Sequence, residues 1–214
     1  MRPGTHWRPA QGEPTVTVLL RHGQTPMSVQ KRYAGRSDAS LTDVGVQQAA
    51  AAAKRLASSG IAVIMTSPLL RTVQTAQEVA AVTGAAVITD DGFRETDFGA
   101  WEGLTFTEVR ERWPAELATW LADPAVAPPG GESFTDVSAR VSAALHRVLG
   151  ARAGQTVLIV SHVTPIKTLV AAALLAPPAA LYRMHLDVAA LSAIDWYTDG
   201  PAVLRSFNDT GHLS

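Results

Sequence analysis

Four polar residues stand where short apolar segments end, and their types suit one kind of chemistry. His22 and His162 each follow a run of Val, Leu and Ile that is typical of a buried strand. Arg71 and Glu95 lie a few residues beyond two further runs of this kind. Because reactive groups in open α/β sheets gather outside the carboxyl ends of the strands, we expect all four side chains at one rim of one sheet.

The chemistry that such a set can support is phosphoryl transfer. A neutral imidazole at His22 can attack phosphorus and divide a difficult hydrolysis into two easier displacements. Arg21 and Arg71 can neutralise the phosphate without a metal ion, and a cationic His162 would add another hydrogen-bond donor. A protonated Glu95 can protonate the leaving oxygen and then activate water for the second step.

The composition argues against several other kinds of protein. The chain has no cysteine, which excludes disulfides, thiolate metal sites and cysteine nucleophiles. A formal net charge of -1 gives no general attraction to nucleic acid or to anionic membranes. Residues 1–15 show no signal-peptide pattern, and the longest apolar run, residues 169–178, is too short to cross a bilayer. We therefore expect a cytoplasmic protein that uses no metal or other cofactor and binds neither nucleic acid nor membrane.

The elements that must position these residues alternate along the chain. Residues 1–14 are rich in Pro and Gly and are expected to be a linker or a remnant of expression, ahead of one domain over residues 15–214. Strands are predicted at residues 15–20, 61–66, 85–89 and 156–160, and a closing hairpin at 189–196 and 202–207. Helices are predicted at residues 42–59, 67–82, 106–112, 114–122, 133–149 and 165–175. The glycines expected to end helices are Gly60, Gly84 and Gly150.

This alternation predicts an α/β fold. Strands that are separated by helices form a largely parallel sheet with both faces covered, and the hairpin adds antiparallel strands at one side. The expected architecture is a three-layer sandwich with a central, mostly parallel mixed sheet. The helical excursion over residues 106–122 should lie above the phosphate pocket and determine substrate choice.

Several motifs, in one order along the chain, resemble those of the histidine phosphatase superfamily, also called the phosphoglycerate mutase-like family. The first is Arg21-His22-Gly23. The others are residues 35–49, with Gly35, Leu41-Thr42 and Gly45, then 67–76 (SPLLRTVQTA), 95–103 (ETDFGAWEG), 130–133 (GGES) and 161–162 (SH). A lone Arg-His-Gly is a weak signal, whereas six ordered motifs that cover most of the chain are specific.

By this resemblance, His22 is the nucleophile that becomes a phosphohistidine, and Glu95 is the proton donor. The residues that it implies as contacts of the phosphoryl group are Arg21, Thr25, Ser28, Arg71, Glu95, His162 and the backbone N–H of Val163. Ser28 departs from the family, which often has Asn six residues after the catalytic histidine. A serine hydroxyl can still donate one hydrogen bond, so we expect altered phosphate contacts and not lost activity.

Further segments narrow the resemblance. Residues 128–134 (PPGGESF), 160–167 (VSHVTPIK) and 181–186 (LYRMHL) look like the C-terminal acid phosphatase half of bifunctional ribonuclease H/acid phosphatase proteins. Relatives of that half act as α-ribazole phosphatases in cobalamin assembly. The resemblance therefore implies that the substrate is α-ribazole 5′-phosphate or another small phosphate monoester. It also implies a ribonuclease H domain fused upstream in the natural chain.

Two alternative functions stay open. Phosphoglycerate mutases of this family carry a long insertion between the WEG and GGES motifs, whereas residues 103 and 130 are joined here by a short helical stretch. A short excursion leaves the site open to water, which favours hydrolysis over transfer. A module that binds phosphorylated ligands without catalysis is the other alternative, although all five predicted catalytic residues are present. The sequence does not determine the oligomeric state.

Other residues that could carry chemistry have simpler explanations. Histidines with no partner at metal-ligand spacing are expected to be incidental, namely His6, His146 and His212. Asp90-Asp91 precedes a glycine and is expected to form a turn. His185, in residues 181–186, either caps the pocket or ends a helix. Trp113 and Trp120 are expected in the core or in the pocket wall.

Overall fold

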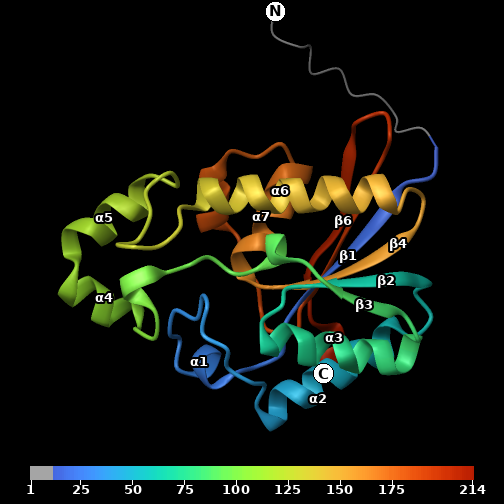
Figure 1. Cartoon of the computed structure of the whole chain (residues 1–214), viewed down its shortest axis with the longest axis horizontal. Helices are drawn as coiled ribbons and strands as arrows, with labels where there is room; N and C mark the ends of the chain where they lie inside the picture. The colour runs from blue at the N-terminus through green and yellow to red at the C-terminus, as the bar shows by residue number, and fades with distance from the viewer. Residues whose placement is uncertain (1–11) are drawn as a thin grey trace, which may run out of the picture.

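A six-stranded sheet forms the centre of the chain in this computed structural model, which describes residues 12–214 (Figure 1). The strands are β1 (Thr15–Arg21), β2 (Ile61–Thr66), β3 (Ala86–Thr89), β4 (Thr156–Ser161), β5 (Leu191–Trp196) and β6 (Ala202–Asp209). Their order is β3-β2-β4-β1-β5-β6, and the first four are parallel while β5 and β6 are antiparallel to their neighbours. The predicted mixed sheet and its closing hairpin are confirmed. His6 and most of the expected linker lie outside the described residues.

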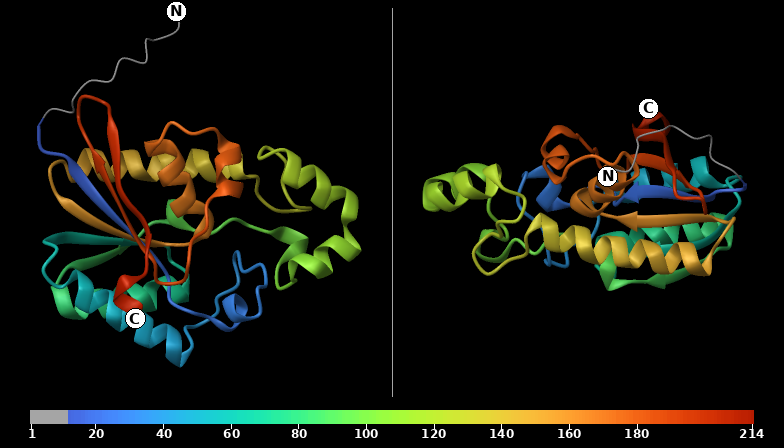
Figure 2. Two further views of the ribbon diagram at one scale, coloured as in Figure 1. Left: turned by 180° about the vertical axis from the view of Figure 1, so that it is seen from behind. Right: turned by 90° about the horizontal axis from the view of Figure 1, so that it is seen from above.

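Helices cover both faces of the sheet, because successive strand residues point to opposite sides. In β1, Leu19 packs in one core with residues of α6 and α7, whereas Leu20 packs in a second core with residues of α2 and α3. The left view of Figure 2 shows the sheet between one helical layer above and another below, as predicted for a three-layer sandwich. The four long helices are α2 (Asp43–Leu56), α3 (Leu70–Thr83), α6 (Phe134–Ala151) and α7 (Val163–Ala173).

Some predicted helix ends are wrong. Helix α2 ends at Leu56, and Gly60, with φ of 64°, forms part of the turn into β2. Helix α6 continues through Gly150 to Ala151. Gly84 closes α3 in a left-handed conformation, as predicted. A glycine therefore marks a helix end only where the chain needs the left-handed region at that residue.

The starts of α3 and α7 also differ from the prediction, by about two to three residues. Ser67 donates its backbone N–H to the carbonyl of Val160 and so extends the sheet, which delays α3 until Leu70. Helix α7 begins earlier than predicted, at Val163, because Pro165 falls within its first turn, where a missing N–H costs nothing.

The predicted helical excursion consists of α4 (Phe106–Arg112) and α5 (Pro114–Ala122), which project at one end of the molecule (Figure 1). A capping box between Thr105 and Glu108 fixes the start of α4. The single-turn elements were not predicted, since one turn shows no periodicity. They are α1 (Pro26–Val29), η1 (Asp91–Phe93), η2 (Gly99–Trp101), η3 (Pro178–Arg183) and η4 (Gly211–Leu213). Asp90 caps η1, which confirms the expected turn. No helix within residues 12–214 is long and apolar enough to cross a membrane.

Candidate active site

The parallel pairing of β1 and β4 brings the two predicted histidines together. Arg21 lies opposite Ser161 at the carboxyl ends of these strands, so the next residues, His22 and His162, are neighbours. Their ring centroids are 5.2 Å apart, and the rings meet edge to face. The sequence-based placement of both histidines at one rim is therefore correct.

His22 is buried and held in one tautomer. Its Nδ1 lies 2.8 Å from the carbonyl oxygen of Gly23, which can only accept a hydrogen bond, so Nδ1 carries the proton. Nε2 has no hydrogen-bond partner within the described part of the chain and keeps its lone pair. Burial, and then the charges of Arg71 and Arg21, lower the pKa of His22 well below its usual value. The imidazole is thus neutral at neutral pH, as a nucleophile must be.

Two glycines let the segment after His22 lie directly against α2. A Cβ atom on Gly23 would collide with the carbonyl group of Gly45, and a Cβ atom on Gly45 would collide with the backbone of Gln24. The backbone N–H of Gln24 also donates to Gln48 Oε1 at 2.8 Å. The close approach explains why glycine is needed at both positions and why the segment that carries His22 is fixed.

Arg21 is a half-buried cation beside His22. Its Nη1 donates to the carbonyl of Leu186 at 2.6 Å, and its buried Nε has no partner among residues 12–214. Burial lowers the pKa of Arg21 to about 10, although the charge of Glu95 opposes this effect. The guanidinium therefore stays cationic at neutral pH and has donors available for an anion.

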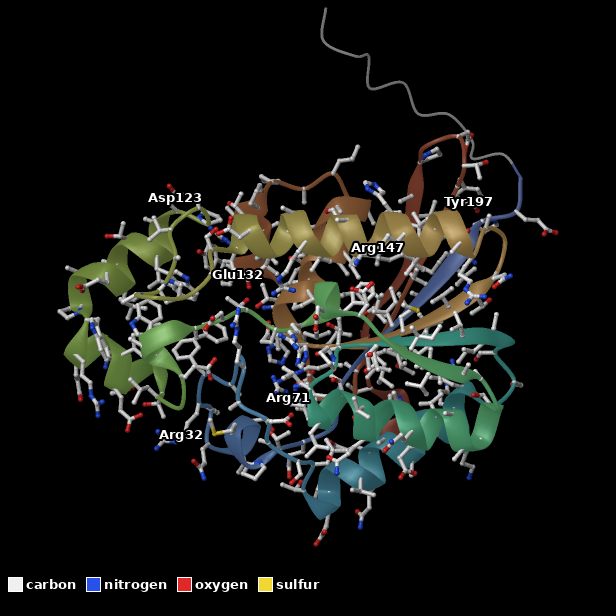
Figure 3. All side chains as sticks on the ribbon, in the orientation of Figure 1. Arg32, Arg71, Asp123, Glu132, Arg147 and Tyr197 are labelled. Atoms are coloured by element: carbon white, nitrogen blue, oxygen red, sulfur yellow. The ribbon has the colours of Figure 1, made fainter. Side chains whose placement is uncertain are left out.

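Arg71 lies behind the two histidines and is occupied by backbone groups. Its Nη atoms donate to the carbonyls of Ala34, Gly35 and Ser37 at 2.6–3.0 Å, and its Nε donates to His162 Nδ1 at 3.2 Å. The side chain lies near the centre of the molecule in Figure 3. Arg71 thus fixes residues 34–37, and its contact with a phosphoryl group stays a prediction.

His162 is neutral in this structure, so the condition under which it would add a cationic donor is not met here, and its contact with a phosphoryl group stays a prediction. Nδ1 accepts from Arg71, so the proton is on Nε2, which lies 2.8 Å from the hydroxyl of Ser67. Burial, and then the charge of Arg71, lower the pKa of His162 well below its usual value. A second proton would have to displace the hydrogen bond from an arginine, and the cationic form is therefore disfavoured.

Glu95 is bound by backbone N–H groups at the start of α7. Its Oε2 accepts from Val163 at 3.1 Å, and its Oε1 accepts from Thr164 at 3.2 Å and from Thr96 at 2.9 Å. The Val163 N–H, which we expected to meet a phosphate, is thus taken by Glu95 in this structure. These three bonds fix the position of the carboxyl group at the start of α7.

The neighbouring carboxylates that could have shared the role of Glu95 have other partners. Glu102 accepts from the backbone of Gly35 and Arg36, and Asp97 forms an ion pair with Arg36. Glu132 forms an ion pair with Arg140. Among the described residues that line the cavity, Glu95 is the only carboxylate.

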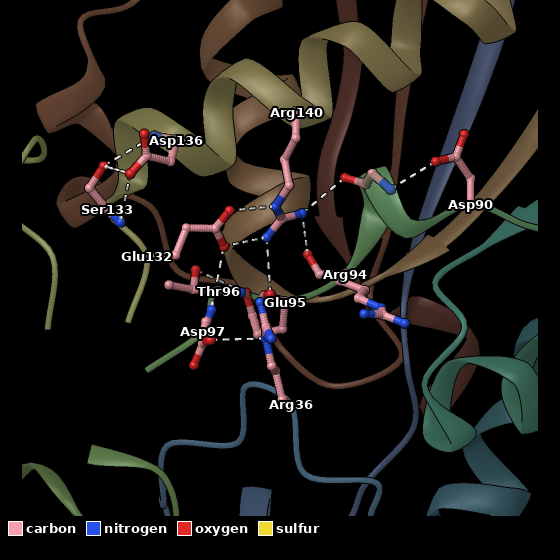
Figure 4. A network of polar contacts seen from close by, with 11 residues as sticks. Arg36, Asp90, Arg94, Glu95, Thr96, Asp97, Glu132, Ser133, Asp136 and Arg140 are labelled. Atoms are coloured by element: carbon pink, nitrogen blue, oxygen red, sulfur yellow. Dashed lines mark hydrogen bonds and ion pairs between the residues drawn. The ribbon is translucent and has the colours of Figure 1, made fainter. Parts of the chain in front are cut away.

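Arg140, on α6, holds the backbone around Glu95 (Figure 4). Its guanidinium donates to the carbonyls of Gly92, Arg94 and Glu95 at 2.7–3.0 Å and to both carboxylate oxygens of Glu132. Sequence reasoning missed this role, because backbone partners leave no signal in residue types. The nearby GGES motif, which contains Glu132, could have pointed to it.

Thr25 and Ser28 line the cavity, but their hydroxyls bind each other's backbone. Ser28 Oγ donates to the carbonyl of Thr25 at 2.8 Å and accepts from the Thr25 N–H at 2.9 Å. Thr25 Oγ1 in turn accepts from the Ser28 N–H at 3.2 Å. The two residues form the capping box of α1, and a phosphate contact from Ser28 would have to replace its bond to the Thr25 carbonyl.

A cavity of about 420 Å³ opens over these groups, and its two sides differ. We call the side formed by Arg21, His22 and Glu95, with Arg71 and His162 behind it, the polar floor. The other side, which we call the aromatic wall, belongs to one apolar cluster and consists of Tyr33, Phe98, Trp120, Phe134, Leu181 and Tyr182. Trp120, in α5, confirms that the excursion reaches the pocket, whereas neither Trp113 nor the exposed His185 lines it.

Two cations that sequence reasoning missed also line the cavity. Lys167 lies one helical turn after Val163 in α7, and Arg32 follows α1. The four-residue spacing from Val163 could have identified Lys167, because such residues share one face of a helix. Within residues 12–214, His, Asp and Glu side chains form no group that could hold a metal ion.

Comparisons with known proteins agree with this geometry. Residues 17–210 match the family model described as "Histidine phosphatase superfamily (branch 1)". The chain is 50% identical over 208 residues to "Bifunctional protein Rv2228c" of Mycobacterium tuberculosis, covering 97% of this chain but only 57% of that relative's length. It is 34% identical to "Probable phosphoglycerate mutase GpmB" of Yersinia pestis, covering 91% of this chain and 93% of that protein.

Solved structures show the same fold. The mycobacterial glucosyl-3-phosphoglycerate phosphatase Rv2419c, in a complex with VO3, matches with a TM-score of 0.85 and 31% identity, covering 92% of this chain and all of that one. A candidate alpha-ribazole-5′-P phosphatase from Escherichia coli matches with a TM-score of 0.84 and 27% identity, covering 92% of this chain and 97% of that one.

Proposed function

Because the chain belongs to branch 1 of the histidine phosphatase superfamily, we propose that it hydrolyses phosphate monoesters through a phosphohistidine on His22. Enzymes of this family act as phosphatases or mutases. In the proposed first step, His22 Nε2 attacks phosphorus, the bond to the alcohol oxygen breaks, and protonated Glu95 gives that oxygen its proton. In the second step, Glu95 takes a proton from water, whose oxygen displaces the phosphoryl group from His22.

The observation that carries this proposal is the free Nε2 of a neutral His22 in the same cavity as Arg21 and Glu95. One cavity thus offers a nucleophile, a cation and a carboxyl group. Arg21 would bind the phosphoryl oxygens. Arg71 uses four of its five N–H groups on present partners and has one left to donate, whereas His162 would have to give up its hydrogen bond to Ser67. We propose that no metal ion is needed, because the arginines supply the positive charge.

We further propose that the substrate is α-ribazole 5′-phosphate or another small monoester. We also propose that its hydrolysis takes place in the cytoplasm. The aromatic wall favours a substrate whose alcohol half contains a flat apolar ring. Offset and edge-to-face contacts between rings stabilise such a complex beyond the burial of apolar surface. The E. coli structure with the same fold supports the same substrate. A ribonuclease H domain in the whole protein also stays a proposal, supported by the greater length of the bifunctional relative.

A mutase is the second candidate, favoured by the 34% identity to the Yersinia protein. The two functions differ in where the phosphoryl group goes from His22. We expect water to receive it, because α4 and α5 form a short excursion and the cavity stays open. Incubation with 3-phosphoglycerate should therefore release inorganic phosphate, if it reacts, and yield no 2-phosphoglycerate.

The proposal is tested by His22→Ala. Release of phosphate from p-nitrophenyl phosphate should be abolished, while His146→Ala, an exposed change on α6, should leave it intact. Mass spectrometry of protein quenched in alkali should show a phosphorylated His22 in the wild type. Undiminished turnover by His22→Ala would reject the mechanism. Turnover that is lost with a chelator and restored by a metal would reject metal independence.

Assays of the wild type with different monoesters test the substrate. The ratio kcat/KM for α-ribazole 5′-phosphate should exceed the ratios for 3-phosphoglycerate and for p-nitrophenyl phosphate. Equal ratios would reject α-ribazole 5′-phosphate as the specific substrate and leave the mechanism on His22 standing.

A further inference from the structure

Lys167 places an ammonium group inside the cavity, where it forms no ion pair with any residue of the range 12–214. The residue is half-buried in α7, and its Nζ donates to the carbonyl of Leu181 at 3.3 Å. No carboxylate lies within ion-pair distance of Nζ in the described ranges of the chain. Burial lowers the pKa of Lys167, which shows that the charge is held at a cost.

Arg32 shows how the other newly identified cation is neutralised. Its Nη1 lies 2.8 Å from Glu108 Oε2 and also donates to the carbonyl of Gly103. Figure 3 shows Arg32 near the outside of the molecule. Arg32 is thus a satisfied ion pair at the rim, whereas Lys167 has only one neutral acceptor. A charge that is drawn from water and left unmatched is expected to be matched by a ligand.

Lys167 lies near the polar floor, since the charges of Glu95 and Arg21 act on it, but its hydrogen bond is to the other side of the cavity. Its acceptor, the carbonyl of Leu181, belongs to η3, and the side chain of Leu181 packs with Trp120 and Phe134 in the aromatic cluster. The ammonium is therefore tied to the aromatic wall. In the proposed reaction, His22 and Arg21 hold the phosphoryl group and the wall receives the alcohol half.

We infer that Lys167 binds a hydrogen-bond acceptor on the alcohol half of the substrate, so that the enzyme selects monoesters whose alcohol half includes an aromatic or heteroaromatic ring that carries such an acceptor. This inference rests on the proposed hydrolysis. A carboxylate and a neutral ring nitrogen both meet the requirement. The carboxylate makes the stronger probe, because its negative charge adds a direct electrostatic attraction to the ammonium beyond the hydrogen bond that both groups can accept.

The test compares phenyl phosphate with 3- and 4-carboxyphenyl phosphate, in the wild type and in Lys167→Met. Methionine keeps most of the apolar stem and removes the charge. The preference is kcat/KM for a carboxyphenyl ester divided by kcat/KM for phenyl phosphate. The intrinsic reactivity of each ester is the same for both proteins, so a change in this preference reports the contribution of the Lys167 side chain. We expect the preference of the wild type for at least one carboxyphenyl ester to fall about 10- to 100-fold in Lys167→Met.

Two further variants keep the test decisive. Lys167→Arg, which retains a cation, should restore much of the preference, and Lys54→Met, an exposed change on α2, should not alter it. If Lys167→Met does not fold, Lys167→Gln replaces it. The same preference in wild type and variant would overturn the inference, and so would an equal loss for all three esters, which would place Lys167 against the phosphoryl group.

Failure of the inference differs from failure of the proposed function. A wild type that does not hydrolyse phenyl phosphate or its carboxylates would reject the hydrolysis and the inference with it. A wild type that hydrolyses all three esters without favouring a carboxylate would reject only the inference.

Discussion

The polar floor and the aromatic wall line one cavity, but different interactions hold them. In the floor, buried polar side chains bind backbone groups, as Arg71 binds three carbonyls and Glu95 binds three N–H groups. In the wall, rings from distant segments pack edge to face or tilted, with centroids of Trp120 and Phe134 5.0 Å apart. The floor thus depends on directional bonds, and the wall depends mainly on apolar contact.

This difference predicts how the two sides respond to change. Removal of one hydrogen-bonding group in the floor leaves its partners buried and unpaired, which costs more than the bond itself contributed. Replacement of one ring in the wall can be absorbed by its neighbours, since cores tolerate apolar substitution of similar volume. We therefore expect floor variants to change kcat and wall variants to change mainly KM.

The largest effect is expected from Glu95→Gln, which keeps the shape of the side chain and removes its acid. Loss of a general acid typically reduces rates by about 10²–10⁴. The loss should be greater for alkyl phosphates than for p-nitrophenyl phosphate, whose leaving group needs no proton. Steady-state kcat over a series of leaving groups measures this dependence.

The matched control is Glu102→Gln, because Glu102 also accepts backbone N–H groups but does not line the cavity. Its kcat should stay within about tenfold of the wild type. An equal loss for every leaving group would remove the acid role from Glu95. Equal losses in both variants would show that the floor is sensitive to any lost carboxylate.

Arg140→Met should have the next largest effect, because Arg140 fixes the backbone that carries Glu95. Its side chain is 24% exposed, so the loss of its ion pair with Glu132 costs less than a fully buried pair would. We expect kcat to fall about 10- to 100-fold with the same leaving-group dependence as in Glu95→Gln. Kinetics together with thermal unfolding separates this positioning effect from a loss of fold.

Arg147→Met is the control for Arg140→Met, since Arg147 also joins α6 to the same loop. Arg147, labelled on α6 in Figure 3, pairs with Asp90. Its side chain is 59% exposed. An exposed pair contributes about 0–1 kcal/mol, so kcat and the unfolding temperature should change little. A loss of kcat as large as in Arg140→Met would show that general anchoring of the loop matters, and not the bond to the backbone of Glu95.

The two sides should lose stability at opposite ends of the pH scale. In the floor, burial lowers the pKa of His22 and His162, so below about pH 6.5 the unfolded chain binds protons that the folded chain does not. Stability should therefore fall as pH decreases from 6.5 towards the folded pKa values, by about 1.4 kcal/mol per pH unit for each histidine. Urea unfolding at pH 7, 6 and 5 measures this slope, and His162→Gln should make it shallower. An unchanged slope in that variant would contradict a neutral His162.

In the wall, the change of stability with pH has the opposite sign. Burial raises the pKa of Tyr33 to about 12, so the unfolded chain loses a proton near pH 10 that the folded chain retains. Stability should fall as pH rises from 10 to 12, and Tyr33→Phe should reduce that loss. Urea unfolding over this range checks the prediction. A wild-type stability that does not decrease there would show that Tyr33 ionises freely in the folded protein.

The two histidines of the floor could be predicted from the sequence, because each directly follows a strand. His22 and His162 needed only the strand order and the rule that sites gather at carboxyl ends. The protonation state of His162 could not be predicted, since it depends on which ring nitrogen faces Arg71. Arg140 was missed for a similar reason, because its partners are backbone carbonyls that look the same in any sequence.

The wall was predicted only in part. Trp120 was named as a candidate for the pocket, and Tyr182 lies in a segment that was expected near it. Tyr33, Phe98 and Phe134 come from three further segments without a shared period, so only the packed structure brings them together. The end of α2 was misplaced because Gly60 suits a turn as well as a helix end.

The smallest effect is expected from Tyr182→Phe, which removes one hydrogen bond from the wall and keeps the ring. The Tyr182 hydroxyl donates to the carbonyl of Trp120 at 2.8 Å, and the loss of such a bond costs about 0.5–1.5 kcal/mol. We expect KM for aromatic monoesters to rise by at most about tenfold and kcat to stay unchanged. Tyr197→Phe, in the turn of the closing hairpin, should alter neither constant. A fall in kcat as large as the rise in KM would mean that the wall also aligns the phosphoryl group, and the division between binding in the wall and chemistry in the floor would then be wrong.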